Sequence, residues 1–526
     1  MREPNAVFVQ ADPSDGLTGP ARAGVEVSWN DGTVEVTAAK VSRVALRWSE
    51  KLPDDALILG DAWERSYGDL QWRHRQPERL LPWYFLAHSA AGTFGMGVDV
   101  QPNAFCAWTV DRDGFTLWLD LRNGGGPALL DGRTLTAAVV RRFEDAGTPW
   151  QTLHAAVASM STRLPARPEP APVAGPVAGP VVGANNWYYA YGENFDEKAV
   201  LQDASTIVEL ADGHPVRPFS VVDDGWYPGG IASGGPWDRG TPGVFDDLAG
   251  TAAAIKAIGA RPGLWFRPLL VREPSALASK GPHDKPGRAL DPSRPEVLDG
   301  VRADLERFRS WGFELVKHDF STYDVFGNFG PAMGSRLTSG GWQFHDKSRT
   351  TAEIVLAFYR EIRAAADDVV LIGCNTVGHL AAGLVDVQRT GDDTSGRDWE
   401  RTRKMGVNTL AFRLPQHNRF FTVDADCVPC TPQTPWELNE RFLDLVARSG
   451  TALFLSIDPA ARTERSDRAL RDGIRLALDG GAVGRGEESG IEPVDWLVNT
   501  TPNVWRAGDE TIDYDWSQPW GADPIG

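Results

Sequence analysis

The sequence has few cysteines and no long apolar run. Only 4 of its 526 residues are cysteine, too few for a disulfide framework in a chain of this length. The one close pair, Cys427 and Cys430, lacks the second Cys pair or His pair that would complete a zinc site, so we expect no metal and no cofactor. No stretch approaches the roughly 20 apolar residues of a transmembrane helix.

Positive charge is also scarce. The chain carries 53 Lys and Arg against 71 Asp and Glu, a formal net charge of -18. Phosphate backbones and anionic lipids repel such a chain, so nucleic acid and membranes are not expected partners. The N-terminal residues contain no apolar run of signal-peptide length, and we expect a cytoplasmic enzyme. A homo-oligomer is compatible with this composition.

Apolar and aromatic residues, in contrast, are plentiful. The chain is 42% hydrophobic and contains 20 Trp, a composition that excludes extensive disorder. Indole rings fill protein cores, and their flat faces also pack against the apolar faces of sugar rings. The tryptophan content is therefore compatible with carbohydrate as the substrate.

The chain divides where its composition changes. Short alternating segments such as Val25–Trp29 and Phe115–Leu119 are typical of half-buried antiparallel strands. A proline-rich stretch follows, which favours extended backbone and cannot build a core. The predicted parts are an N-terminal β-sandwich domain at 1–164, a linker at 165–183, a catalytic domain at 184–480 and a small C-terminal β domain at 481–526.

The third part alternates between apolar strands and amphipathic helices. The expected strands are Trp187–Tyr191, Pro218–Val222, Gly263–Phe266, Phe313–Lys317, Val369–Ile372, Leu384–Val387, Phe420–Val423 and Leu453–Ser456, and the expected helices include 296–311, 350–365, 435–448 and 464–478. Eight buried strands separated by helices predict a (β/α)8 barrel. Its active site would lie at the carboxyl ends of the strands.

Carboxylates follow several of these strands. They are Asp223 and Asp224, then Asp319, then Asp392 and Asp393, then Asp424 and Asp426. Glycosidic bond hydrolysis needs one carboxyl group to protonate the leaving oxygen and a second to attack or to activate water. Any one of these residues alone is as well explained as a helix N-cap. The nearby cations Lys317 and Arg389, which capping does not require, favour a catalytic site.

The ordered motifs resemble those of the family 36 α-galactosidases, which share a clan with family 27. They are Asp223-Asp-Gly-Trp226, Gly263-Leu-Trp-Phe266, Lys317-His-Asp319, Gly373-Cys-Asn375 and Arg389-Thr-Gly-Asp-Asp393. The resemblance spans residues 184–460, and the order of a β domain, a barrel and a small β domain also looks like that family. It implies a retaining, exo-acting α-galactosidase.

The resemblance also implies roles for individual residues. Asp319 would be the nucleophile and Asp393, four residues after an arginine, the acid/base, with Asp392 as the alternative. Asp223 and Asp224 would accept hydrogen bonds from the O4 and O6 hydroxyls. The other expected substrate contacts are Lys317, Arg389, Cys374, Asn375, Trp187, Trp226 and Trp265.

Some features depart from the family pattern. The family commonly has Glu where this chain has Arg267, which would favour an anionic substituent on the substrate or would pair with a local carboxylate. His318 replaces an aromatic residue, and strand alternation should turn its side chain away from the pocket. Asp424 or Asp426 would contact the substrate or brace the barrel.

A polar, aromatic stretch of the N-terminal part, from Gly60 to Trp72, resembles the loop that covers the barrel mouth in the family. We expect Trp63 or Trp72 to border the pocket, with ordinary packing between domains as the alternative. Two rival functions remain open. One is another α-glycosidase or transglycosylase of the clan, such as an α-N-acetylgalactosaminidase or an enzyme for an anionic α-glycoside, and the other is a non-catalytic sugar-binding protein.

Overall fold

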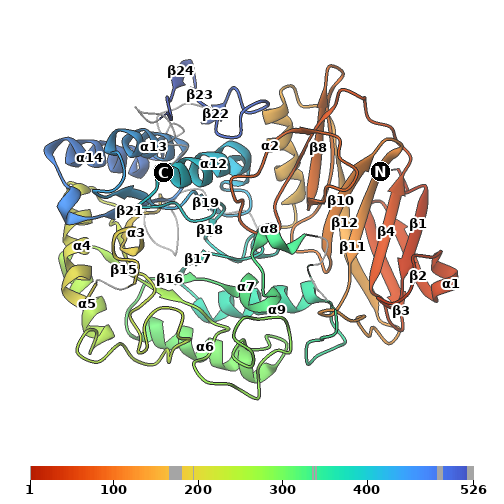
Figure 1. The fold of residues 1–526 in the computed structure, drawn as a ribbon, viewed down its shortest axis with the longest axis horizontal. Helices are drawn as coiled ribbons and strands as arrows, with labels where there is room; N and C mark the ends of the chain where they lie inside the picture. The colour runs from red at the N-terminus through yellow and green to blue at the C-terminus, as the bar shows by residue number, and fades with distance from the viewer. Residues whose placement is uncertain are drawn as a thin grey trace, which may run out of the picture.

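The computed structural model describes residues 2–164, 180–192, 195–334, 337, 340–481 and 490–517. A parallel sheet curls into a barrel surrounded by helices, and two antiparallel sheets of the N-terminal part pack beside it (Figure 1). A three-stranded antiparallel sheet lies near the C-terminus. Residues 165–179 of the expected linker at 165–183 lie outside the described residues, and its last two residues belong instead to the first barrel strand.

The barrel sheet contains nine parallel strands in the order β19-β18-β17-β16-β15-β14-β13-β21-β20. The strands are β13 (Val182–Asn185), β14 (Phe219–Val222), β15 (Arg261–Phe266), β16 (Leu315–His318), β17 (Val370–Gly373), β18 (Val387–Arg389), β19 (Thr422–Asp424), β20 (Val428–Cys430) and β21 (Leu453–Ile457). A parallel bridge between Asp424 and Ala452 connects the end of β19 to the start of β21. That bridge closes the ring, so the predicted TIM-barrel fold class is confirmed.

The helices that surround the barrel follow the predicted periodicity. Those foreseen from sequence are α6 (Pro295–Ser310), α9 (Thr351–Ala366), α13 (Trp436–Ser449) and α14 (Glu464–Leu478), and the structure adds α4 (Glu197–Leu210) and α5 (Leu248–Ile258). Shorter helices connect the remaining strands: α3 (Trp187–Ala190), α7 (Ser321–Phe326), α8 (Gly330–Met333), α10 (Gly378–Ala381), α11 (Trp399–Thr402) and α12 (Asn408–Arg413). A capping box between Thr350 and Glu353 fixes the start of α9.

The first barrel strand differs from the prediction. The run Trp187–Tyr191 was expected to be a strand, but its first four residues form helix α3, and the strand is β13, just before it. A short apolar run has no periodicity that separates helix from strand. Gly183 lowers the apparent strand propensity of β13, yet a Cβ there would lie 2.8 Å from the carbonyl oxygen of Phe219, so close strand packing requires glycine.

The N-terminal part forms two antiparallel sheets, as expected for a β-sandwich. One has the order β1-β4-β11-β10-β7 and the other β2-β3-β12-β9-β8-β5-β6. Their strands are β1 (Ala6–Gln10), β2 (Val25–Asn30), β3 (Thr33–Ala38), β4 (Arg43–Trp48), β5 (Leu57–Gly60), β6 (Arg73–His74), β7 (Leu81–Pro82), β8 (Tyr84–Ser89), β9 (Gly92–Val98), β10 (Phe105–Asp111), β11 (Gly114–Asp120) and β12 (Thr134–Phe143). Helices α1 (Pro20–Ala23) and α2 (Pro149–Met160) were not predicted.

The C-terminal sheet contains β22 (Ile491–Pro493), β23 (Val504–Ala507) and β24 (Glu510–Asp513). Trp496, between β22 and β23, contacts the N-terminal part: its ring lies 5.3 Å from that of Trp72 and 5.2 Å from that of Trp150. The C-terminal and N-terminal parts of the chain are therefore in contact.

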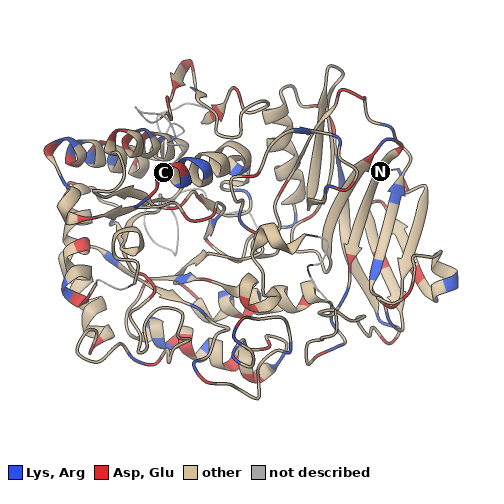
Figure 2. Ribbon diagram, in the orientation of Figure 1, with Lys and Arg blue, Asp and Glu red and all other residues tan. Residues whose placement is uncertain are grey.

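Acidic and basic residues are interspersed along the outer helices of the barrel (Figure 2). Across the described ranges, none of the helices combines the length and the apolar character needed to span a bilayer. Within the same ranges, no cluster of three or more His, Cys, Asp or Glu side chains is arranged to bind a metal ion.

Candidate functional site

A pocket of about 230 Å³ lies where several barrel strands end. It is lined by Arg65, Tyr67, Asp319, Phe320, Phe329, Asn375, Asp392, Asp393 and Arg401. Asp319 follows β16, Asn375 follows β17, and Asp392 and Asp393 follow β18. The sequence therefore brings both expected catalytic carboxylates to one cavity at the carboxyl end of the barrel.

Strand alternation sets which side chains of β16 point into the barrel. Leu315 belongs to the apolar cluster shared by neighbouring barrel strands, and Lys317, two residues later, contacts Asp223, which follows β14, two strands away in the sheet. His318 faces the other way and lies 5.7 Å from Phe358 and 5.8 Å from Tyr359 of α9. Its burial lowers its pKa to about 3, so His318 is a neutral core residue.

Asp319 is held by two donors. The indole Nε1 of Trp265 donates to Oδ2 at 3.0 Å, and the backbone N–H of Phe320 donates to Oδ1 at 2.6 Å. Phe320 adopts a left-handed conformation with φ of 62°, which is uncommon for a bulky residue. The carboxylate is thus fixed in orientation while 8% of the residue stays exposed to the pocket.

Arg267 contacts Phe320, the residue whose backbone N–H binds Asp319. Its Nε and Nη2 donate to the two carboxylate oxygens of Asp324 at 3.0 and 2.5 Å, and its guanidinium lies 4.1 Å from the ring centre of Phe320. His283 Nε2 lies 3.0 Å from Oδ1 of the same Asp324. Of the two roles expected for Arg267, the structure shows the pairing with a local carboxylate.

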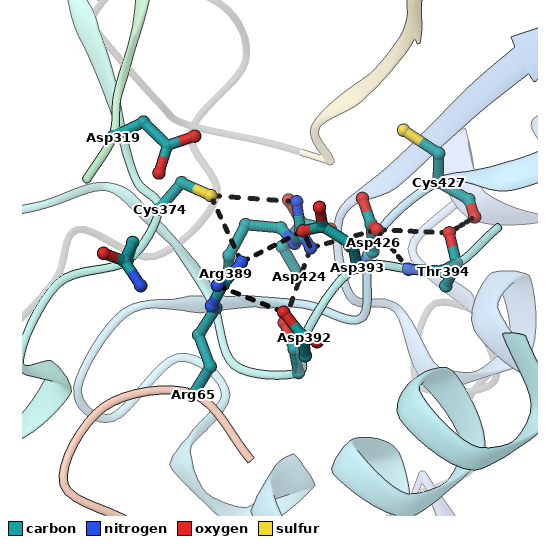
Figure 3. A network of polar contacts seen from close by, with 12 residues as sticks. Arg65, Asp319, Cys374, Arg389, Asp392, Asp393, Thr394, Asp424, Asp426 and Cys427 are labelled. Atoms are coloured by element: carbon teal, nitrogen blue, oxygen red, sulfur yellow. Dashed lines mark hydrogen bonds and ion pairs between the residues drawn. The ribbon is translucent and has the colours of Figure 1, made fainter. Parts of the chain in front are cut away.

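Asp393 lies across from Asp319, whose side chain points toward the group formed by Cys374, Arg389 and Asp393 (Figure 3). Arg65 Nη1 and Arg389 Nη2 donate to the same oxygen, Oδ1, at 3.0 and 3.1 Å. Burial favours the neutral acid, but the charges of these two arginines and of Lys317 outweigh it and hold the pKa of Asp393 well below its usual range. The side chain keeps 39% exposure, so it is open to a substrate.

Asp392, the alternative acid/base, is more enclosed. Arg65 Nη2 lies 3.1 Å from Oδ1 and Arg401 Nη2 lies 2.6 Å from Oδ2, so both carboxylate oxygens are ion-paired. Its side chain is only 11% exposed. Asp393 is therefore the more accessible of the two carboxylates.

Asp426 braces the loop that carries Asp393. Its Oδ2 accepts hydrogen bonds from Tyr188 Oη, from the backbone N–H of Thr394 at 2.7 Å and from the Thr394 hydroxyl at 3.1 Å, and Arg389 Nη2 lies 3.0 Å away. Asp424 is buried, and burial raises its pKa to about 7. Of the two roles expected for Asp424 and Asp426, Asp426 has the bracing one.

Asp223 and Asp224 directly follow β14, are 2% and 6% exposed, and are not among the residues that line the pocket. Lys317 Nζ and Asn185 Nδ2 donate to Asp223 Oδ2 at 2.7 and 2.5 Å. Tyr227 Oη donates to Asp224 Oδ1 at 2.6 Å. Burial, reinforced by the charges of Asp223 and Asp319, raises the pKa of Asp224 to about 7 despite the Tyr227 hydrogen bond.

Cys374 and Asn375 directly follow β17. The Cys374 thiol lies 3.8 Å from Arg389 Nη1, and its burial raises its pKa, so it remains a thiol. Asn375 Nδ2 donates to Glu64 Oε2 at 2.8 Å. Glu64 belongs to the N-terminal part, so this contact links the two parts of the chain at the pocket.

The expected tryptophans mostly serve packing. Trp226 has no exposed surface, and its ring contacts Phe308 and Trp311 at 6.0 and 6.4 Å. Trp187 is partly buried on α3 and packs 5.8 Å from Tyr191. Trp265, in contrast, meets the pocket through its hydrogen bond to Asp319.

The N-terminal loop reaches the barrel mouth, but through different residues from those expected. Trp63 packs 5.2 Å from Trp83, and Trp72 packs 6.2 Å from His88. Arg65 and Tyr67 of the same loop line the pocket instead. The aromatic residues of the loop drew attention to it, but the sequence did not single out Arg65 and Tyr67, which lie between Trp63 and Trp72, as pocket residues.

Arg401, Phe320 and Phe329 were also not foreseen as pocket residues. Arg401 follows Asp398, the N-cap of α11. The Phe329 ring stacks 4.6 Å from Tyr323 and keeps 36% exposure, so one aromatic wall faces a charged wall formed by Arg65, Asp392 and Arg401. An exposed aromatic residue in a connecting segment gives no sequence signal that separates it from ordinary surface.

Several solved structures share this fold over most of the chain. The structure of TtGalA, an α-galactosidase from Thermus thermophilus in complex with p-nitrophenyl α-D-galactopyranoside, matches with a TM-score of 0.60 at 18% identity, covering 93% of this chain and 95% of that one. Two family 36 α-galactosidases from Geobacillus stearothermophilus also match. AgaA with 1-deoxygalactonojirimycin has a TM-score of 0.56 at 15% identity, covering 93% of this chain and 72% of that one, and AgaB has 0.55 at 14%, covering 87% and 67%.

No protein-family model matches the chain. At these identities the structural likeness establishes the fold alone. The assignment of a reaction must therefore rest on the residues of the pocket.

Proposed function

We propose that this protein is a retaining, exo-acting α-galactosidase, with Asp319 as the nucleophile and Asp393 as the acid/base. The observation that carries the proposal is the placement of these two carboxylates on one pocket at the carboxyl end of the barrel. The environments of these two carboxylates differ. Asp319 is fixed by two hydrogen bonds, whereas Asp393 is exposed and lies between two arginines.

In the first step, an oxygen of Asp319 attacks the anomeric carbon of the galactoside. The bond between that carbon and the leaving oxygen breaks, and the proton of Asp393 passes to the leaving oxygen. The product is a galactosyl ester of Asp319 and a free alcohol. The hydrogen bonds from Trp265 and Phe320 orient Asp319 for this attack and become weaker as its charge is lost.

In the second step, Asp393 takes a proton from a water molecule, which attacks the anomeric carbon and releases galactose with its original configuration. Arg65 and Arg389 favour the carboxylate form of Asp393, which is the form that this step requires. The first step requires the protonated form. Acid-assisted cleavage should therefore be fastest toward the acidic side of the pH profile.

Recognition of the galactose ring would come from Asp223, Asp224 and Lys317. The carboxylates can accept hydrogen bonds from hydroxyl groups, and Lys317 donates from within 2.7 Å of Asp223. A site built to bond a particular hydroxyl strongly rejects sugars that cannot satisfy it. This is the physical basis on which we propose selectivity for the axial O4 of galactose.

A panel of p-nitrophenyl glycosides tests the function. We expect hydrolysis of the α-galactoside, with at most weak hydrolysis of the α-glucoside, the α-N-acetylgalactosaminide and an α-galacturonide. The Asp319→Ala variant, purified in the same way, should be inactive, which shows that turnover belongs to this pocket. No turnover of any glycoside would reject the enzyme assignment, and preference for another α-glycoside would reject the sugar.

A further inference from the structure

Arg65 belongs to the N-terminal part, and its guanidinium forms ion pairs with two carboxylates of the barrel. Nη1 lies 3.0 Å from Asp393 Oδ1, and Nη2 lies 3.1 Å from Asp392 Oδ1 (Figure 3). The arginine side chain is only 7% exposed, although it lines the pocket. The planar fork of arginine fixes the direction of both contacts, which a lysine ammonium would not do.

The loop that carries Arg65 is anchored to the barrel on both sides of that residue. Asp61 accepts from Arg413 Nε at 2.8 Å, and Arg413 Nη1 also donates to the backbone oxygen of Glu64 at 2.6 Å. The backbone N–H of Ser66 donates to Thr390 O at 2.8 Å. Arg65 is therefore held in place by contacts that do not involve its own side chain.

The Ser66 segment is also tied to the loop that carries the acid/base. Ser66 forms a parallel bridge with Gly391, and its carbonyl accepts from the backbone N–H of Asp392 at 2.8 Å. The residue next to Asp393 is thus bonded directly to the residue next to Arg65. Backbone hydrogen bonds therefore hold the segments that carry Arg65 and Asp393 next to each other.

Asp393 is surrounded by charged and titratable groups from several elements. They are Arg65 from the N-terminal loop, Lys317 and Asp319 from β16 and the residue after it, Cys374 from the end of β17, Arg389 and Asp392 from β18 and its loop, Tyr188 from α3, and Asp426 from the loop after β19. Arg65 and Arg389 are the cations in direct contact with the Asp393 carboxylate. Arg389 also pairs with Asp426, whereas Arg65 pairs only with Asp392 and Asp393 among the described residues.

We infer that Arg65 is a positioning residue for catalysis, which orients the acid/base Asp393 and sets its protonation, so that the barrel needs the N-terminal part to work. This inference rests on the proposed function for the identity of the acid/base. It assigns a task to a residue that lies 328 positions away in the sequence.

A purely structural ion pair between domains predicts a different result. Such a pair would affect stability and leave the pH profile of turnover unchanged. The two cases separate in kcat/KM as a function of pH, because the basic limb of a retaining glycosidase reports the pKa of its acid/base. Removing a cation from a carboxylate raises the pKa of that carboxylate, so the basic limb should move to higher pH.

The experiment compares Arg65→Met, Arg65→Lys and Arg133→Met with the wild-type protein on p-nitrophenyl α-galactoside. Arg133 is the matched control, because it also belongs to the N-terminal part and pairs with a barrel carboxylate, Glu353, at 2.8 Å, but at 40% exposure. For Arg65→Met we expect the basic limb to move up by about 1 to 3 pH units. Arg65→Lys should keep the limb near the wild-type position and lose turnover, since its charge remains and the fork is lost. Arg133→Met should match the wild type.

A wild-type basic limb in both Arg65 variants would overturn the inference, as would an equal shift in Arg133→Met. If Arg65→Met fails to fold, as judged by its circular dichroism and thermal unfolding, Arg65→Lys decides: unchanged kcat in that variant would also overturn it. Failure of the proposed function is a separate result, since the wild-type protein would then turn over no α-galactoside at any pH.

Discussion

The indole nitrogen of Trp265 lies 3.0 Å from Oδ2 of Asp319 and donates a hydrogen bond to it. Trp265 is on β15 and Asp319 directly follows β16, its parallel neighbour in the sheet. The Trp265 ring stacks on that of Tyr227 at 6.1 Å, which holds the indole in its plane. The donor is therefore fixed before any substrate arrives, as electrostatic preorganisation requires.

The Trp265→Phe variant keeps the aromatic ring and removes this donor. Because this donor orients the carboxylate for attack, and a misplacement of about 1 Å can cost roughly 100-fold, kcat/KM should fall roughly 10- to 100-fold. Steady-state kinetics on an aryl α-galactoside measures the loss. Trp108→Phe is the control, because Trp108 is equally buried and its Nε1 donates to Trp83 O in the N-terminal part. A loss of similar size in the control would mean that the effect is general destabilisation.

Replacing Asp393 or Asp392 by Asn distinguishes the acid/base from its neighbour. Asp393→Asn should lower turnover of an alkyl galactoside, a poor leaving group, by about 10²- to 10⁴-fold, because the leaving oxygen no longer receives a proton. On a dinitrophenyl galactoside, whose leaving group needs no proton, formation of the galactosyl enzyme should change little. Asp392→Asn, which removes a carboxylate paired with Arg401, should show no such dependence on leaving group. The reverse pattern would exchange the two roles.

Much of this site follows from local sequence patterns. The helices α6, α9, α13 and α14 were predictable because their apolar residues recur at helical spacing, and the carboxylates at strand ends followed from the barrel. The aromatic run at residues 187–191 was wrongly predicted to be a strand, because a segment this short shows no periodicity that separates helix from strand. The two short strands β18 and β19 begin two or three residues later than expected, since strand ends carry the weakest pattern.

What the sequence could not provide is the partner of each charge. Arg65 reaches Asp393 across 328 positions, and Glu64 reaches Asn375 across 311. Such contacts depend on how two domains dock, which no local periodicity encodes. The prediction chose the tryptophans of the loop because the loop resembles one that covers the barrel mouth in the family, with packing as the alternative, and the structure packs them against Trp83 and Trp496.

The raised pKa of Asp224, about 7, predicts a pH dependence of sugar binding. Below pH 7 the group is a neutral acid, and above it a carboxylate, which accepts stronger hydrogen bonds from hydroxyl groups. The affinity for galactose should therefore rise as the pH increases through 7, and Asp224→Asn should remove this part of the rise. Calorimetric titration with galactose between pH 5.5 and about 8.5 measures it.

Asp203 provides the control for that titration. Burial raises the pKa of Asp203 to about 7 as well, but Asp203 lies within α4 and accepts a hydrogen bond from Tyr189, whereas the charge of Asp319 acts on Asp224. Asp203→Asn should keep the wild-type dependence of affinity on pH. If Asp224→Asn also keeps it, Asp224 does not contact the sugar as a carboxylate.

The buried pair of Arg413 and Asp61 should matter more for stability than any surface pair. Their side chains are 2% and 3% exposed, and the atoms lie 2.8 Å apart. Arg413→Met leaves Asp61 buried without its cation, which should reduce stability by roughly 3 to 5 kcal/mol. Thermal unfolding should show a clear drop for this variant and none for Arg465→Met, whose pair with Glu437 is exposed on both sides. Equal melting temperatures for the two variants would contradict this account of the loop.

The covalent intermediate tests the central claim most directly. The protein is mixed rapidly with dinitrophenyl α-galactoside, quenched with acid and digested, and mass spectrometry of the peptides locates any galactosyl group. The Asp393→Asn variant slows the second step, so the intermediate should accumulate in it. The account predicts one galactosyl ester, on Asp319, that is absent from Asp319→Ala. A galactosyl group on another residue, or steady turnover in Asp319→Ala, would contradict it.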